Sequence, residues 1–326
     1  MNCSKIIVVL AALLAQLPLF SEDGVSRDIK LPSRKYKEIT IEVGLDRPFQ
    51  ALHISDSHII RIDDRDFDRL EKRYKKRVNS KYCRYAEVPL MDAVNFVESH
   101  EDMLLIHTGD VIDMHSEAGL DFAAGIFRRV KNCIACNGNH EYINVNGKAS
   151  LAEEDMSLLT PGIQTAFPNN ILFDSRIYNG INFVVIDNCN NQIRPEAFNR
   201  MKEEVKKGLP IVILCHIPFY IPETIQKRLD QRGGAASGAA ASVVGAPLEI
   251  TENYKGNDEK ETGPRYGQRS NETTLEFTEW LRKQDCVKAI LCGHNHKRHE
   301  ERFSPSCMQY TAPACYAGNA NLITFK

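Results

Sequence analysis

Short apolar runs that end abruptly in polar residues dominate the pattern of this sequence. The clearest run, MLLIHTGDVID, covers residues 103–113 and places Asp110 and Asp113 directly after its apolar positions. Four further runs have the same form and lie at residues 49–58, 133–141, 210–216 and 287–296. Apolar runs of this length, bounded by turn residues, are typical of buried β-strands. The pattern therefore predicts five buried strands whose carboxyl ends carry Asp, Asn and His.

Segments with helical character separate these strands. Helices are predicted at residues 88–98, 122–130, 195–207 and 274–282, with a charged helix and loop at 63–84. Further strands are predicted at 35–43, 171–173, 181–186, 307–311 and 322–325, and the 49–54 strand is expected to be the buried neighbour of the 35–43 strand. Strands that alternate with helices are the pattern of an α/β domain.

Composition indicates one large globular domain, assigned to residues 34–326. The chain has 326 residues, of which 43% are hydrophobic and 26% charged, and its net charge of -2 gives no overall indication of nucleic-acid binding. A stretch rich in Gly and Ala, followed by a polar stretch, interrupts the pattern at residues 222–272. Long excursions inside compact domains are often functional lids. Because this one leaves directly after His216, we expect a flexible lid over the site.

The first 21 residues resemble a secretory signal peptide. Lys5 precedes an apolar stretch from Ile6 to Phe20, and polar residues follow. The stretch is shorter than the roughly 20 apolar residues that span a bilayer. We therefore expect an exported protein, secreted or periplasmic. The alternative is an uncleaved N-terminal segment that anchors the protein in a membrane.

Ten cysteines leave an odd number, nine, once residues 1–21 are removed, so they cannot all form intramolecular pairs. Residues three apart on a strand face opposite sides, so Cys133 and Cys136 are not expected to chelate one ion together. Four cysteines are expected to be buried thiols: Cys133, Cys136, Cys215 and Cys292. The sequence leaves open whether Cys307 and Cys315 form a disulfide.

The polar residues at the five strand ends are those that bind metals. Burying several ionisable groups together is costly unless a metal or another partner holds them, so the pattern predicts a metal site. The motifs and their order resemble the calcineurin-like metallophosphoesterase family over nearly the whole chain after the first thirty or so residues. The motifs are DSH at 56–58, GDVID at 109–113, GNHE at 138–141, His216 and GHNH at 293–296.

The resemblance implies a four-layer α/β sandwich, in which two mixed β-sheets are flanked by helices. It also implies two divalent metal ions, manganese, iron or zinc, with Asp110 as the ligand that both share. One ion would be held by Asp56, His58, Asp110 and His296, and the other by Asp110, Asn139, His216 and His294. The neutral amide of Asn139 limits the negative charge around an anionic substrate.

The mechanism implied by the resemblance is hydrolysis of a phosphate ester by a hydroxide formed between the two metals. His140 would protonate the leaving group or stabilise its charge, and Asp113 would orient His140. The alternative for Asp113 is a helix N-cap. Glu141 and His107 receive no role.

The expected substrate is a small phosphomonoester, with a phosphodiester, cyclic nucleotide or nucleotide pyrophosphate as the alternative. A non-catalytic binding module on the same fold is a third hypothesis, but it predicts lost ligands, and all seven are present. Ser/Thr protein phosphatases have Asp-Arg-Gly where Asp113 is followed here by Met114 and His115. Purple acid phosphatases have a tyrosine ligand at the position of Asp113, so no iron-tyrosinate centre is expected. Ten basic residues at 61–84 suggest a solvated helix or, alternatively, a surface that recruits phosphate.

Overall fold

The computed structural model describes residues 34–143, 153–223, 243–247 and 270–326, and within them the chain forms two β-sheets. The five-stranded sheet has the order β1 (Lys35–Ile41), β11 (Asn319–Phe325), β2 (Phe49–Ile54), β3 (Leu104–Thr108) and β4 (Cys133–Cys136). The six-stranded sheet has the order β5 (Phe173–Tyr178), β6 (Ile181–Ile186), β7 (Ile211–Leu214), β8 (Val287–Cys292), β10 (Cys307–Thr311) and β9 (His299–Ser304).

Both sheets are mixed. Strands β2, β3 and β4 are parallel, as are β6, β7, β8 and β10, whereas β11 runs antiparallel to β2 and the edge strands β5 and β9 run antiparallel to their neighbours. The parallel strands of each sheet end at one edge. These edges carry the polar residues that the sequence placed at strand ends.

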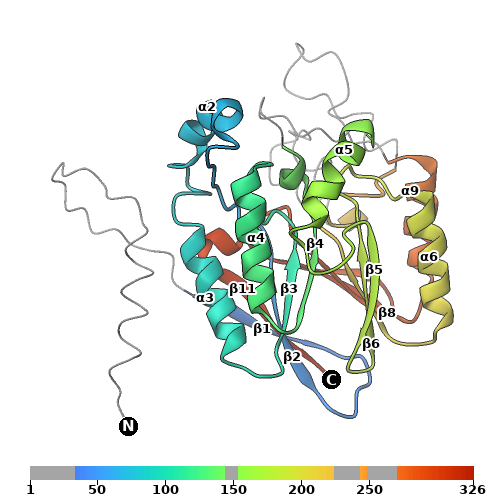
Figure 1. Ribbon diagram of the computed structural model, residues 1–326. Helices are drawn as coiled ribbons and strands as arrows, with labels where there is room; N and C mark the ends of the chain where they lie inside the picture. The colour runs from blue at the N-terminus through green and yellow to red at the C-terminus, as the bar shows by residue number, and fades with distance from the viewer. Residues whose placement is uncertain (1–33, 144–152, 224–242, 248–269) are drawn as a thin grey trace, which may run out of the picture. The chain divides into compact units, whose positions relative to one another are not determined.

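Helices cover the outer face of each sheet, so the domain has the four layers that the family resemblance implies (Figure 1). The helices α3 (Glu87–Glu98) and α4 (Glu117–Arg129) pack on the five-stranded sheet, and α6 (Pro195–Lys206) and α9 (Glu272–Leu281) pack on the six-stranded sheet. Between the sheets lies an apolar layer that includes Phe49, Ile106, Phe183, Leu214 and Phe325. The four-layer α/β sandwich is confirmed.

The expected pairing of the first two strands is wrong, because β11 lies between β1 and β2. The C-terminal strand pairs with β1 in parallel and with β2 in antiparallel orientation. Its residues Ile323 and Phe325 are fully buried, as an interior strand requires. Pairing between residues so far apart in sequence leaves no local pattern to predict it.

Some local elements also differ from the expectation. Strand β5 begins at Phe173, where the predicted strand ends, because the polar residues Asp174 and Ser175 belong to an edge strand that is only half-buried. The helix α4 begins at Glu117, where the Ser116 side chain accepts a hydrogen bond from the Gly119 N–H. The sequence pattern did not indicate α5 (Glu153–Gln164), which contains a proline, or the charged edge strand β9.

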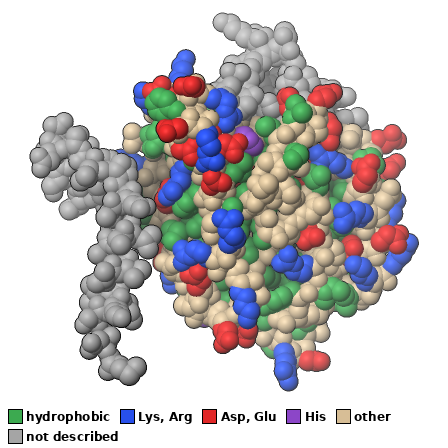
Figure 2. All heavy atoms as spheres, viewed as in Figure 1, with side chains coloured by type: hydrophobic (Ala, Val, Ile, Leu, Met, Phe, Trp, Pro, Cys, Tyr) green, Lys and Arg blue, Asp and Glu red, His purple; other side chains and the backbone are tan. Residues whose placement is uncertain are grey.

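The charged segment after the first motif forms α2 (Phe67–Arg77). Its Leu70 is fully buried in a small cluster with Ile60, Cys83, Met114 and Ile143. Acidic and basic side chains lie close together over α2 on the face that Figure 2 shows. The helix is therefore solvated on its outer side and fixed to the domain on its inner side.

The cysteines behave largely as expected. Cys133 and Cys136 are buried free thiols that belong to apolar clusters on opposite faces of the five-stranded sheet. Cys215 is likewise a buried free thiol, and Cys292 is buried. Cys307 and Cys315 do not pair, since each is a free buried thiol.

The predicted signal peptide at residues 1–21 and most of the predicted lid at 222–272 lie outside the described residues. Within the lid region, Val243 to Pro247 is described, and Val244 exchanges backbone hydrogen bonds of 2.8 and 2.7 Å with Pro218 and Tyr220. This short stretch packs on the chain that follows His216. None of the described helices has the length and apolar character that a membrane crossing requires.

The apolar layer between the sheets should dominate stability. Phe325 is fully buried, stacks on Phe49 at a centroid distance of 5.2 Å and meets Phe183 edge-on at 5.6 Å. We expect Phe325→Ala to lower the free energy of unfolding by about 3–5 kcal/mol, because it leaves a cavity between the sheets. Urea denaturation followed by circular dichroism measures this change. Leu158→Ala, at an exposed position in α5, is the control, and equal midpoints for the two variants would contradict the prediction.

Candidate metal centre

All seven predicted metal ligands lie just beyond the carboxyl ends of parallel strands, six on loops and Asn139 at the start of a short 3-10 helix, η2 (Asn139–Tyr142). They follow β2 (Asp56, His58), β3 (Asp110), β4 (Asn139), β7 (His216) and β8 (His294, His296). Strands β2, β3 and β4 belong to one sheet and β7 and β8 to the other. The centre is therefore built where the edges of the two sheets meet, the usual place for a site in an α/β fold.

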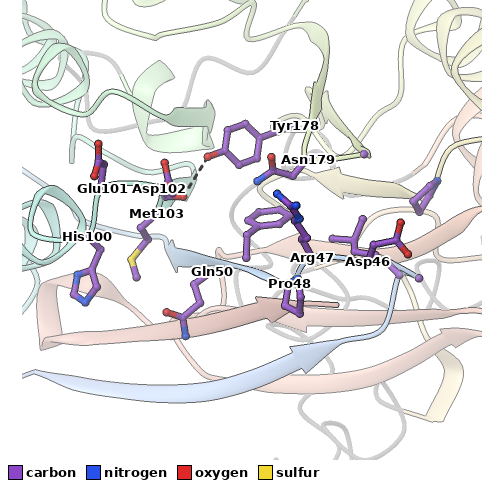
Figure 3. A pocket seen from close by; sticks show the side chains of 16 residues that line it. Asp46, Arg47, Pro48, Gln50, His100, Glu101, Asp102, Met103, Tyr178 and Asn179 are labelled. Atoms are coloured by element: carbon purple, nitrogen blue, oxygen red, sulfur yellow. Dashed lines mark hydrogen bonds between the residues drawn. The ribbon is translucent and has the colours of Figure 1, made fainter.

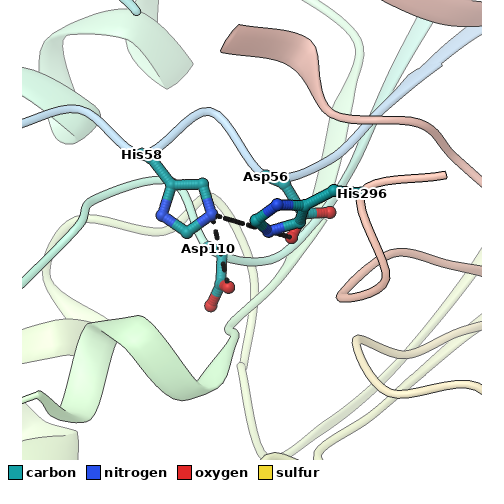
Figure 4. Close-up of side chains that lie close together, drawn as sticks. All are labelled: Asp56, His58, Asp110 and His296. Atoms are coloured by element: carbon teal, nitrogen blue, oxygen red, sulfur yellow. Dashed lines mark hydrogen bonds and ion pairs between the residues drawn. The ribbon is translucent and has the colours of Figure 1, made fainter. Parts of the chain in front are cut away.

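The first group of ligand atoms comes from Asp56, His58, Asp110 and His296, and these atoms lie within 4.8 Å of one another. Their side chains point toward a common centre (Figure 4). The Nε2 atoms of His58 and His296 are 3.0 Å apart, and the Asp56 Oδ1 lies 3.1 Å from His296 Nε2. Two imidazole nitrogens and a carboxylate oxygen that converge in this way fit a shared cation.

The second group of ligand atoms comes from Asp110, His216 and His294. The Nε2 of His216 lies 3.2 Å from Asp110 Oδ2 and 3.3 Å from His294 Nδ1. Beside them is Asn139, whose neighbour His140 donates its backbone N–H to Asp110 Oδ1 at 2.8 Å. The Asn139 Oδ1 is buried without a hydrogen-bond partner among the described residues, which costs about 1–3 kcal/mol unless another group binds it. This oxygen fits a metal ligand.

Asp110 is the one residue common to both groups. Its Oδ2 lies 3.2 Å from His216 Nε2 and 3.8 Å from His58 Nε2. Burial alone would raise the pKa of this carboxyl, but the neighbouring His216 and His140 bring it well below its usual value. The carboxylate is thus charged and placed to bridge two ions.

Hydrogen bonds on the far side of each ring orient three of the histidines. Nδ1 of His216 donates to the Thr108 carbonyl at 2.7 Å, and Nδ1 of His58 lies 3.1 Å from the Asp113 carboxylate. Nδ1 of His296 lies 3.2 Å from the Tyr316 hydroxyl. Each bond leaves Nε2 directed at the centre, as metal-binding histidines require.

Five of the predicted ligands have a left-handed backbone. Their φ angles lie between 50° and 68°, at Asp56, His58, Asp110, His294 and His296. Positive φ is uncommon outside glycine and carries a conformational cost, and such residues cluster at functional sites. Backbone hydrogen bonds of 3.0 Å, from Asp56 N to Gly109 O and from His58 N to Asp110 O, hold these loops in place.

Three glycines permit the close approach of the loops. A Cβ on Gly109 would lie 2.6 Å from His216 Nδ1, one on Gly138 would lie 2.2 Å from Asp110 Oδ1, and one on Gly293 would lie 1.8 Å from Ser55 Oγ. No other residue fits these positions without displacing a ligand or its support.

Two residues without a predicted metal role support the ligand loops. The buried Glu141 carboxylate accepts hydrogen bonds of 2.7 Å from the Val111 and Gly138 N–H groups and one of 3.2 Å from Asp110 N. Burial and the charge of Asp110 raise the pKa of Glu141 to about 7. Asn188, two residues after the end of β6, accepts a hydrogen bond from the backbone N–H of His216 at 3.2 Å.

Asp113 and His140 lie together, but their contact is made mainly through the backbone. Nδ1 of His140 donates to the Asp113 carbonyl oxygen at 2.9 Å, whereas the carboxylate is 3.6 Å away. The carboxylate instead accepts from His58 and, through both oxygens, from Arg77. The helix N-cap alternative is wrong, because Ser116 caps α4.

His58, Asp113 and His140 form a third cluster of metal-type groups. The guanidinium of Arg77 already neutralises the carboxylate of this cluster, so the arrangement suits a hydrogen-bonded relay better than a cation. His107 lies outside all three clusters and meets the Ser57 hydroxyl at 2.9 Å.

A cavity of about 1080 Å³ lies at the opposite end of the strands (Figure 3). It is lined by the loops before β2, β3, β6 and β7, and the Tyr178 hydroxyl donates across it to the Asp102 carbonyl at 3.2 Å. None of the ligand clusters among the described residues borders it, so it is separate from the metal centre.

Solved structures with a related fold include a dimetal phosphatase from Danio rerio, which is 13% identical over 82% of this chain and 88% of that chain, with a TM-score of 0.46. Others are a 5'-nucleotidase from Candida albicans (13% identical, 87% and 48% covered, TM-score 0.40) and a calcineurin-like phosphoesterase from Bacillus subtilis (12%, 82% and 82%, TM-score 0.37). The chain spans about half the length of the nucleotidase.

No curated protein sequence matches the chain significantly. The family model described as calcineurin-like phosphoesterase matches residues 49–298, a span that contains all seven predicted ligands as well as Asp113 and His140. Because that match covers most of the 326 residues, the chain belongs to the calcineurin-like phosphoesterase family.

Proposed function

We propose that this protein is a phosphomonoesterase that uses two divalent metal ions to hydrolyse a small phosphate ester. The proposal is supported above all by Asp110, which belongs to two groups of converging ligand atoms and whose Oδ2 lies 3.2 Å from His216 Nε2 and 3.8 Å from His58 Nε2. Family membership and the buried His and Asp clusters support a metallophosphoesterase with a dinuclear site.

The first ion would be held by Asp56, His58, Asp110 and His296, and the second by Asp110, Asn139, His216 and His294. Manganese, iron and zinc all suit these mixed oxygen and nitrogen donors, and when bound they would supply an activated water and offset charge on the phosphate. Asp56 and Asp110 are the two carboxylates of the set, against four positive charges on two divalent ions. The surplus positive charge favours a phosphate dianion.

His140 is placed to act on the leaving group. Its side chain is 20% exposed, so the ring can be reached from outside the protein. Because Nδ1 donates to the Asp113 carbonyl, proton exchange with a leaving oxygen falls to Nε2. Asp113 then positions two rings, His140 through its carbonyl and His58 through its carboxylate.

A phosphodiesterase or nucleotide pyrophosphatase is the alternative function, and a non-catalytic module is the alternative of another class. The complete ligand set favours catalysis over a binding module. Hydrolysis rates of the purified, metal-loaded protein with mono-, di- and cyclic phosphate esters distinguish these functions. Faster hydrolysis of diesters than of monoesters would contradict the proposal.

We also propose that the protein is exported. The support is the sequence of residues 1–21, with one basic residue, an apolar stretch and a polar end. The alternative remains an uncleaved N-terminal anchor.

Asp110→Asn should abolish activity, because it keeps the size of the side chain but removes the charge shared by both ligand groups. We expect kcat/KM to fall on the order of a thousandfold and bound metal to fall below two ions per chain. Mass spectrometry of metals after dialysis, together with hydrolysis rates, measures both. Asp121→Asn, at an exposed position in α4, is the control. Full activity of Asp110→Asn or of the chelated protein would refute the metal mechanism.

His140→Ala should slow turnover while both metals stay bound. For a substrate with a poor alkoxide leaving group, kcat should fall about a hundredfold or more. For p-nitrophenyl phosphate, whose leaving group needs no proton, the decrease should be much smaller. Equal decreases for the two substrates would exclude the acid role.

Gly293→Ala should damage the centre through its backbone. The added Cβ would lie 1.8 Å from Ser55 Oγ and 2.7 Å from Asp56 Oδ2, so the loop that carries His294 must move. We expect metal affinity to fall at least tenfold, as when support for a ligand is lost. Gly125→Ala in α4 is the matched control, since its Cβ meets nothing within 4 Å. Unchanged metal affinity in Gly293→Ala would show that the loop adapts freely.

A further inference from the structure

The helix α2 is linked to one half of the metal centre. Arg77, in its last turn, donates to both oxygens of the Asp113 carboxylate, and the bond from Nε to Oδ2 measures 2.8 Å. The Oδ1 of Asp113 in turn lies 3.1 Å from His58 Nδ1. Arg77 is therefore joined through a single side chain to a ligand of the first group, which Figure 4 shows.

The bonds from Arg77 determine which histidine the carboxylate serves. Its planar guanidinium binds both oxygens at once and so fixes the plane of the carboxylate. In this orientation Oδ1 lies closer to His58 Nδ1, at 3.1 Å, than to His140 Nδ1, at 3.6 Å. Burial alone would raise the pKa of Asp113, but the hydrogen bonds from Arg77 and His58 lower it below its usual value. A charged carboxylate only accepts, so His58 keeps its proton on Nδ1 and presents a bare Nε2 to the centre.

The same guanidinium also packs on Tyr82, in the turn after α2. The Cζ of Arg77 is 5.2 Å from the centroid of the Tyr82 ring. That ring lies 6.0 Å from the ring of His58 and 5.5 Å from the ring of His296, between centroids. Tyr316, whose hydroxyl is 3.2 Å from His296 Nδ1, meets Tyr82 at 5.3 Å. Tyr82 therefore lies against both histidines of the first group.

The histidines of the second group have no such link. Among the described residues, none of the hydrogen bonds, ion pairs or ring contacts of His216 and His294 involves α2 or the turn after it. Their partners lie at the carboxyl ends of the strands instead. The inner face of α2 is fixed to the domain by the fully buried Leu70. The helix is thus a rigid support for one ligand group and not for the other.

We propose that Arg77 is a positioning residue that sets the affinity of the centre for the first ion and leaves the second nearly unaffected. It acts through Asp113 and Tyr82 on His58 and His296, which only the first group contains. This inference rests on the proposed function, because it requires that the two ligand groups hold two divalent ions. Loss of an outer partner of a ligand histidine lowers metal affinity about 10- to 100-fold, and here the loss should be confined to one ion.

Binding of Mn²⁺ to the metal-free protein measures the two affinities. We expect calorimetry to give two Mn²⁺ per chain for the wild type, and Arg77→Gln to weaken one of them at least tenfold and the other less than about threefold. With two equivalents added, electron paramagnetic resonance should show isolated Mn²⁺ in the variant and a spin-coupled pair in the wild type. Equal weakening of both ions, or of neither, overturns the inference.

Two further variants separate hydrogen bonding from charge. Arg77→Lys keeps the charge but cannot bind both carboxylate oxygens in one plane, so we expect it to restore only part of the affinity for the weakened ion. It also tests the inference if Arg77→Gln does not fold, as judged by circular dichroism of the metal-free protein. Lys76→Gln removes a charge from the adjacent exposed position and should change neither affinity. Full affinity in Arg77→Lys would show that charge alone acts, and this overturns the inference.

Combined variants identify which ion is affected. In a His294→Ala background, which keeps the whole first group, Arg77→Gln should weaken the remaining Mn²⁺ at least tenfold. In a His58→Ala background it should have less than about a twofold effect, because the ring that Arg77 positions is already absent. The reverse pattern overturns the inference. Failure of the wild type to bind two Mn²⁺ would refute the proposed dinuclear function, whereas two ions that respond equally to Arg77→Gln refute only the assignment of Arg77.

Discussion

The Asp110 carboxylate is the point on which the structure of the centre depends. One oxygen faces histidines from both sheets, and the other accepts the backbone N–H of His140. For this carboxylate to reach both groups, the loop after β3 must pass against the loop after β4, which requires Gly138, and must be anchored by the Glu141 side chain. The position of the Asp110 carboxylate therefore depends on its own left-handed backbone, on the missing Cβ of Gly138 and on the hydrogen bonds to Glu141.

The centre also depends on how the two sheets pack against each other. The ligands after β7 and β8 come from a different sheet than those after β2, β3 and β4, so no ligand group is complete within one sheet. The apolar layer that contains Phe49, Phe183 and Phe325 sets how the sheet edges meet. A substitution that alters side-chain volume deep in this layer would therefore shift the predicted ligands, because close-packed interiors transmit strain.

Sequence patterns indicated which polar residues meet at the strand ends far better than they indicated the contacts that support these residues. Asp110 and His216 each follow an apolar run, and this local pattern can be recognised in the sequence without knowledge of the fold. The contact of Tyr316 with His296, the clamp of Arg77 on Asp113 and the insertion of β11 between β1 and β2 join residues that no periodicity connects. Such pairings are decided by tertiary packing. Glu141 was visible within its motif, but its bonds to backbone N–H groups become apparent only once the loops are folded.

The left-handed backbone at five ligand positions restricts which side chains the centre can use. Asp, Asn and His are the metal-binding residues that adopt positive φ most readily, whereas other residues do so at a higher conformational cost. Exchanging a ligand for glutamate or cysteine would alter the loop as well as the donor atom. Any preference of the centre for particular metals would therefore depend on the conformation of its loops as well as on its donor atoms.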